Sequence, residues 1–60
     1  MYYVAWWCSS NWGEVSEVYS DVHKANVWIA ERCRNEHVER QEIVSFESRE
    51  RAEDYRRNGK

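Results

Sequence analysis

The run Tyr2–Cys8 constrains the fold more than any other part of the chain. It reads Tyr-Tyr-Val-Ala-Trp-Trp-Cys, an apolar stretch rich in the aromatic residues that favour strands. Successive side chains of a strand point to opposite faces, and here both alternating sets are apolar. A strand with one face in water would carry a polar residue at every second position. The run therefore predicts a central strand that is covered on both faces.

A hairpin is expected after this strand. The residues Ser9–Gly13 are mainly turn formers, and Gly13 could supply the positive φ that hairpin loops of this length often need. The next stretch, Glu14–Tyr19, mixes polar and apolar side chains as an edge or half-exposed strand does.

The clearest helical pattern lies in Val22–Asn35. Its apolar residues on one face are Val22, Ala25, Ile29 and Cys33. Ser20 and Asp21 are both good N-cap residues, and either could begin this helix.

A third strand and a second helix are expected in the rest of the chain. Arg40–Phe46 has the composition of a strand, and Ser48 could cap a short helix at Arg49–Arg57. The apolar residues of that helix are Ala52 and Tyr55 alone, and a helix this short must dock on the sheet or fray.

Short connections and the right-handed crossover rule arrange these elements. The first helix would bring the third strand parallel to the second, and the third strand would lie on the far side of Tyr2–Cys8. We therefore expect one small domain, residues 1–60, of the α+β class. It is a two-layer ββαβα fold with a three-stranded mixed sheet in the order 2-1-3. The second helix or a partner subunit would cover the second face, and 58–60 would form a loose tail.

Charge and the lack of targeting segments limit location and partners. Nine basic and eleven acidic residues leave a net charge of −2, without a basic block that would bind phosphates. The start of the chain has no basic leader, and Tyr2–Cys8 is too short to span a membrane. We expect a cytoplasmic protein without membrane association, in which Cys8 and Cys33 are reduced thiols.

Cysteine and histidine are the residues that could bind a metal or supply a nucleophile. Cys8, Cys33 and His37 could gather at one end of the domain, which makes a small zinc-binding domain one alternative. His23 would lie about 15 Å from Cys33 along the helix, too far to share the ion. The spacings lack the close Cys pairs of structural zinc sites, so core and surface roles without a metal or cofactor are favoured. Since nothing would orient a histidine as base beside Cys8, we expect no enzyme.

Binding of nucleic acid is a further alternative. Aromatic side chains on a strand can stack on bases, and Tyr2 is the candidate. The accompanying arginines would be Arg49, Arg51, Arg56 and Arg57. Acidic residues interleave with these arginines, which favours a solvated helix face over a phosphate-binding one.

Binding of a protein partner has the best local support. Trp12 is predicted at the hairpin tip and Trp28 at the margin of the first helix's apolar face, as in interface hot spots. Tyr3 and Trp7 would join them if the second helix left their side of the strand open, which would also permit a homodimer. The alternative is that these rings only complete the core.

In size, single-domain organisation and absence of catalytic signatures, the chain resembles the very short accessory proteins that temperate bacteriophages make early. The resemblance implies a regulatory protein that binds a host protein or modulates transcription in the host cytoplasm, and it assigns no residue roles. We therefore expect a small, non-enzymatic interaction protein that acts by surface binding.

Overall fold

The fold is known from a computed structural model that describes residues 1–35 and 37–58. Its elements, in chain order, are β1 (Tyr2–Cys8), β2 (Gly13–Val15), α1 (Val22–Asn35), β3 (Arg40–Phe46) and α2 (Arg49–Arg57). Of the tail expected at 58–60, Asn58 is the C-cap of α2, and Gly59 and Lys60 lie outside the described residues.

The strands form one sheet in the order β2-β1-β3, which confirms the predicted α+β class and strand order. β1 pairs antiparallel with both neighbours: Trp6 lies opposite Val15, and Tyr2 lies opposite Phe46. The prediction of a mixed sheet is therefore wrong. β2 and β3 do point the same way, as the crossover rule requires, but β1 separates them, so no parallel pair forms.

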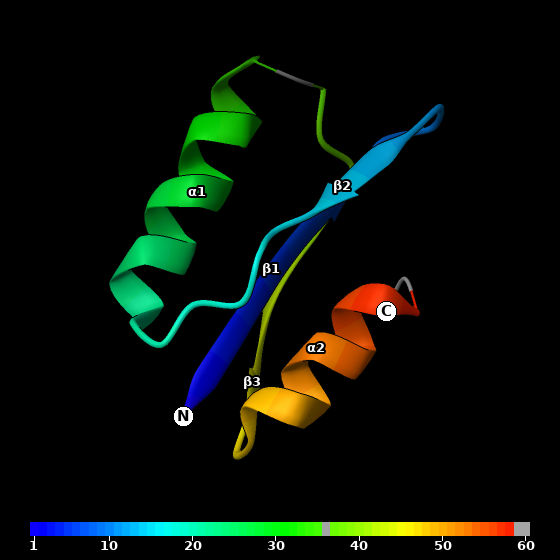
Figure 1. Cartoon of the computed structure of the whole chain (residues 1–60). Coiled ribbons are helices and arrows are strands. Elements are labelled where there is room, and N and C mark those ends of the chain that lie inside the picture. The colour runs from blue at the N-terminus through cyan, green and yellow to red at the C-terminus, as the bar shows by residue number, and fades with distance from the viewer. Residues whose placement is uncertain (36, 59–60) are drawn as a thin grey trace.

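The two helices lie on opposite faces of the sheet (Figure 1), so the molecule has three layers rather than the two predicted. α1 covers the face of β1 that carries Ala5 and Trp7, and α2 covers the face that carries Val4 and Trp6. All four side chains are buried. Burial of β1 on both faces is confirmed, and the second face is covered by α2 without a partner subunit.

The larger part of the core lies beneath α1. Ala25 and Ile29 of α1 pack with Ala5 and Trp7 of β1. Half-buried residues around them are Tyr3, Tyr19, Trp28, Cys33, Val38 and Ile43. Val22, which the helical pattern placed on this face, is instead exposed in the first turn of α1.

β2 is shorter than the strand predicted over Glu14–Tyr19, because one extra residue interrupts its pairing with β1. Val15 lies opposite Trp6, but the next pairing is an isolated bridge between Tyr19 and Tyr3. The three residues between Val15 and Tyr19 therefore span the same distance as the two residues of β1 between Trp6 and Tyr3. This extra residue defines a β-bulge.

Ser16 fills this break and is almost completely buried, with 2% of its surface exposed. Its amide donates to the carbonyl oxygen of Ala5 (2.7 Å), and its hydroxyl oxygen accepts from the Ala5 amide (2.9 Å). The hydroxyl in turn donates to the carbonyl oxygen of Glu17 (2.8 Å). The side chain thus substitutes for a ladder carbonyl that the bulge has displaced.

Glycine is needed at position 13 because the backbone passes close to Trp7 there. The expectation of a positive φ at this residue is wrong. Gly13 pairs with Cys8 at the end of the hairpin, and its φ lies outside the left-handed region. A Cβ at this position would lie 2.5 Å from the carbonyl oxygen of Trp7, far closer than van der Waals contact allows.

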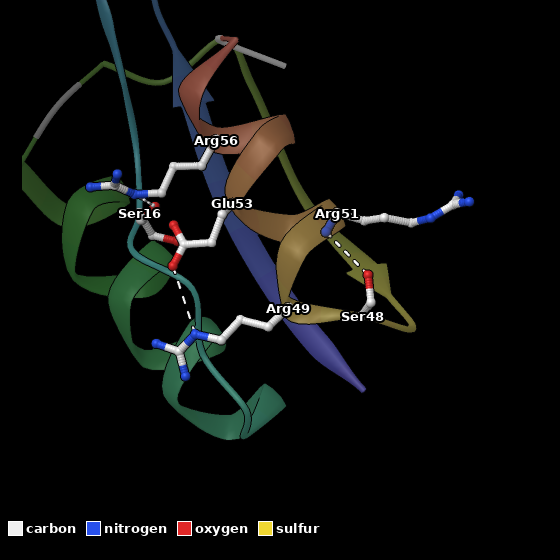
Figure 2. Close-up of polar contacts among 6 residues, drawn as sticks. All are labelled: Ser16, Ser48, Arg49, Arg51, Glu53 and Arg56. Atoms are coloured by element: carbon white, nitrogen blue, oxygen red, sulfur yellow. Dashed lines mark hydrogen bonds and ion pairs between the residues drawn. The ribbon is translucent and has the colours of Figure 1, made fainter.

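Short polar side chains begin both helices. Of the two candidates for α1, Asp21 is the cap: its Oδ1 accepts from the amide of His23 (2.9 Å). For α2, the hydroxyl of Ser48 accepts from the amide of Arg51 (3.1 Å), as Figure 2 shows, and this confirms the predicted cap.

Candidate protein-binding surface

The hairpin loop presents Trp12 on a rigid backbone. The amide of Ser9 donates to the carbonyl oxygen of Trp12 (2.7 Å), and the Ser9 hydroxyl donates to the same oxygen (3.0 Å). That hydroxyl oxygen also accepts from the amide of Trp12 (3.4 Å). One serine side chain thus holds both backbone groups of Trp12, while 52% of the residue's surface remains exposed.

The ring of Trp12 packs on the buried core through Trp7. The two ring centroids are 4.9 Å apart at an interplanar angle of 75°, an edge-to-face contact. Trp7 itself is 0% exposed. Trp7 is therefore a support for the exposed ring and has no surface of its own to offer a partner.

A chain of contacts leads from Trp7 to α1. The indole Nε1 of Trp7 donates to Glu14 Oε1 (3.1 Å), and the Nε of Arg32 lies 3.1 Å from the same oxygen. The guanidinium carbon of Arg32 lies 5.1 Å from the ring centroid of Trp28, within the range of a cation–π interaction. The Glu14–Arg32 pair is more than a third exposed, so its main effect is to hold the two side chains in place.

We call the surface formed by Trp12, Glu14, Trp28 and Arg32 the Trp12–Trp28 surface. It joins the hairpin to α1 through the contacts just described. Trp12 and Trp28 were candidates from the sequence, whereas Glu14 and Arg32 were missed. Tyr3, the remaining candidate, is half-buried and packs against the core beneath α1.

The structure does not bring the candidate zinc ligands together. Cys8 shares the face of β1 that carries Val4 and Trp6, whereas Cys33 packs against the core on the opposite face. The Sγ of Cys33 donates to Oε1 of Gln41 in β3 (3.1 Å). Among residues 1–35 and 37–58, no three His, Cys, Asp or Glu side chains form a group that could hold a metal ion.

Three of the four candidate arginines of α2 contact the chain itself. Arg56 Nε donates to the carbonyl oxygen of Ser16 (2.9 Å), across to the β-bulge (Figure 2). The other two form ion pairs within the helix: Arg49 with Glu53 (3.7 Å) and Arg57 with Asp54 (3.2 Å). The side chain of Arg51 extends away from this group (Figure 2). Tyr2, at the start of β1, is half-buried.

Two tyrosines have shifted acidity. Burial raises the pKa of Tyr19 above its usual value, and the carboxylate of Glu17 raises it further. Burial also raises the pKa of Tyr55; a hydrogen bond from Trp6 lowers it, and the carboxylate of Glu42 raises it. Both net shifts raise the pKa, so both phenols stay protonated near pH 7.

Neither α1 nor α2, the two helices in the part of the chain that the structure describes, has the length and apolar content needed to cross a bilayer. No protein family model matches the chain, and searches of curated proteins and of solved structures return no significant match.

Proposed function

We propose that this chain is a small, non-enzymatic protein that binds a protein partner through the Trp12–Trp28 surface. The observation that carries the proposal is the state of Trp12: half of its surface is exposed, yet its backbone and its ring are both held in place. A large ring that is already immobile loses little conformational entropy when a partner covers it. Regulation of that partner in the cytoplasm, as the phage resemblance implies, is part of the proposal.

The residues beside Trp12 fit this role. Tryptophan and arginine are the residue types most enriched among interface hot spots, and Arg32 stacked on Trp28 combines both. Because Glu14 accepts a hydrogen bond from Trp7 and forms an ion pair with Arg32, the guanidinium is held in position before a partner arrives.

Binding of nucleic acid has less support. Arg49, Arg56 and Arg57 each contact an oxygen of the chain itself, which leaves fewer cationic groups for phosphates. The acidic residues of α2 further reduce any attraction of a polyanion.

The test is Trp12→Ala, with Val27→Ala as the matched control at an exposed apolar residue of α1. The tagged unchanged chain and both tagged variants are used as baits in a lysate. The amount of the protein that the unchanged chain retains is then measured for each variant. Loss of a hot-spot tryptophan costs about 2 kcal/mol or more, so Trp12→Ala should weaken retention about 30-fold and Val27→Ala should leave it unchanged. Equal retention by both variants would contradict the proposal, and so would unfolding of Trp12→Ala in a thermal melt.

A further inference from the structure

The two edges of the sheet differ. β2 has three residues, and the bulge at Ser16 interrupts its continuation. β3 has seven residues, and all of them pair with β1 in one unbroken register. A short, bulged strand is a poor template for another strand, whereas a long regular edge is a good one.

The hydrogen bonds of β1 establish which way its backbone groups point. Tyr3 exchanges both backbone bonds with Tyr19, so its N–H and C=O point toward the β2 side. Ala5 points the same way, because its N–H and C=O both bond to Ser16. In an antiparallel sheet this direction alternates along the strand, so Val4 points toward β3.

The same alternation holds along β3. Val44 lies opposite Val4 and therefore directs its N–H and C=O toward β1. Gln41, Ile43 and Ser45 direct theirs away from the sheet. Within residues 1–35 and 37–58, no hydrogen bond engages these three backbone units on that side. The edge therefore presents three donors and three acceptors in register.

This edge carries a net negative charge. Glu39, Glu42 and Glu47 are exposed, and Arg40 is the one basic residue among them. Their combined charge of −2 equals the net charge of the whole chain. None of these four side chains takes part in an ion pair in the part of the chain that the structure describes.

We propose that β3 binds an extended segment of a partner protein as an additional antiparallel strand. The segment would carry an apolar residue opposite Ile43 and basic residues opposite the three glutamates. Main-chain bonds would supply affinity, and the charge pattern would supply specificity.

A second copy of this chain fits the edge less well. Pairing Gln41, Ile43 and Ser45 with their own copies requires Ile43 opposite Ile43, which places Glu39 opposite Glu47 of the second copy at both ends. Like charges directly opposite each other destabilise a strand pair. A basic segment has no such conflict.

The probe is a capped peptide, Lys-Val-Thr-Val-Val-Lys-Thr-Glu-Lys. In antiparallel pairing its lysines lie opposite Glu47, Glu42 and Glu39, its glutamate opposite Arg40, and its central valine opposite Ile43.

Two control peptides are used. The first carries N-methyl groups on both threonines and the central valine, which removes the donors that would face β3. In the second, each lysine is replaced by glutamate. Binding is measured by fluorescence anisotropy of labelled peptide. We expect both control peptides to bind at least about 30-fold more weakly than the probe.

Variants of the chain locate the site. Ser45→Pro removes one outward N–H at an exposed residue and leaves the β1–β3 bonds intact, so affinity should fall about fivefold. Glu47→Lys should weaken binding about fivefold and reduce its salt dependence, whereas Glu17→Lys, the same charge change beyond β2, should alter affinity by less than about twofold.

Three results would overturn the proposal. The first is equal affinity for the probe and the N-methylated peptide, a comparison that requires no variant of the chain to fold. The second is equal weakening by Glu17→Lys and Glu47→Lys, which reflects general charge attraction. The third is a dimer, measured by solution mass, that Ser45→Pro dissociates, since a second copy would then occupy the edge. The site is separate from the Trp12–Trp28 surface, so Trp12→Ala should leave peptide affinity unchanged whether or not the proposed function holds.

Discussion

The two helices cover opposite faces of the same strand by different means. α1 packs Ala25 and Ile29 against β1, and half-buried Trp28 and Cys33 widen the contact. α2 has a single fully buried residue, Ala52, and its only other apolar side chain, Tyr55, lies against Phe46 (5.1 Å between ring centroids). α1 is held mainly by burial of its own apolar side chains, whereas α2 contributes little apolar surface of its own.

Polar contacts position α2 instead. Its first turn is capped by Ser48, and near its end Arg56 bonds to the backbone of Ser16 at the sheet edge. The small side chain of Ala52 lets the helix approach the strand closely. A highly charged helix can thus cover a strand face when its contact residue is small and a polar bond ties it to the sheet.

The variant with the largest expected effect tests the packing beneath α1. Trp7→Ala should lower the free energy of unfolding by about 3–5 kcal/mol, because the cavity lies beneath α1 and no polar contact can replace the lost burial. A single core of this size supplies about that much stability, so the variant should be largely unfolded in urea titrations followed by circular dichroism. A loss below about 1 kcal/mol would remove the distinction between the two faces.

Ser16→Ala tests the β-bulge, whose backbone accepts the bond from Arg56 of α2. The amide of Ala5 would lose its acceptor inside the sheet, which costs about 1–3 kcal/mol. Ser45→Ala, at an exposed position of β3, is the control and should cost less than about 0.5 kcal/mol. The same urea titrations measure both variants, and equal losses would show that the Ser16 hydroxyl contributes no specific bond.

Most of the fold could be predicted because local patterns encode it. The apolar residues on both sides of Tyr2–Cys8 require two covers, and the period of Val22–Asn35 identifies one of them. The bulge could not be predicted, since Ser16 looks like an ordinary polar residue of an edge strand until its pairing is known. The mixed sheet was an error of geometry: a strand that is parallel to β2 and lies beside β1 must be antiparallel to β1.

The site was partly predictable for the same reason. Exposure of Trp12 follows from its place in the hairpin loop. Burial of Trp7 depends on which helix covers its face: the sequence pattern assigned that face to the second helix, whereas the structure places α1 there. The pairing of Glu14 with Arg32 depends on the hairpin register and the packing of α1 together, so no local pattern signals it.

Ser48→Ala compares a capping bond with an exposed ion pair in the same helix. The cap should contribute about 1 kcal/mol, because the Arg51 amide loses its partner at the helix N-terminus. Arg49→Ala, which removes the exposed pair with Glu53, should cost about 0.5 kcal/mol or less. Thermal melts of both variants measure the difference. A larger loss for Arg49→Ala would mean that ion pairs, not the cap, hold α2.

High pH should produce the smallest effect, with one reporter on each face. Tyr19 and Tyr55 both have a pKa raised by burial, so the unfolded chain releases these protons first as the pH rises past about 10. Titration of these groups should leave the free energy of unfolding constant below that pH. Above it, the free energy of unfolding should fall until the pH reaches the folded-state pKa. Urea titrations between about pH 8 and about pH 11 measure this decline, and Tyr19→Phe or Tyr55→Phe should reduce it. If the free energy of unfolding declined equally in both variants and in the unchanged chain, other titrating groups would be its cause.

The pairing of Tyr2 with Phe46 has a consequence for synthesis of the chain. Residues 2–8 are synthesised well before residues 40–57, and at about 5–20 residues per second the interval from Cys8 to Arg40 is about two to six seconds. During that interval, Val4 and Trp6 have neither β3 beside them nor α2 above them. The apolar face that the finished protein buries is therefore covered only when the C-terminal third of the chain has been made, so β1 cannot complete its packing before then.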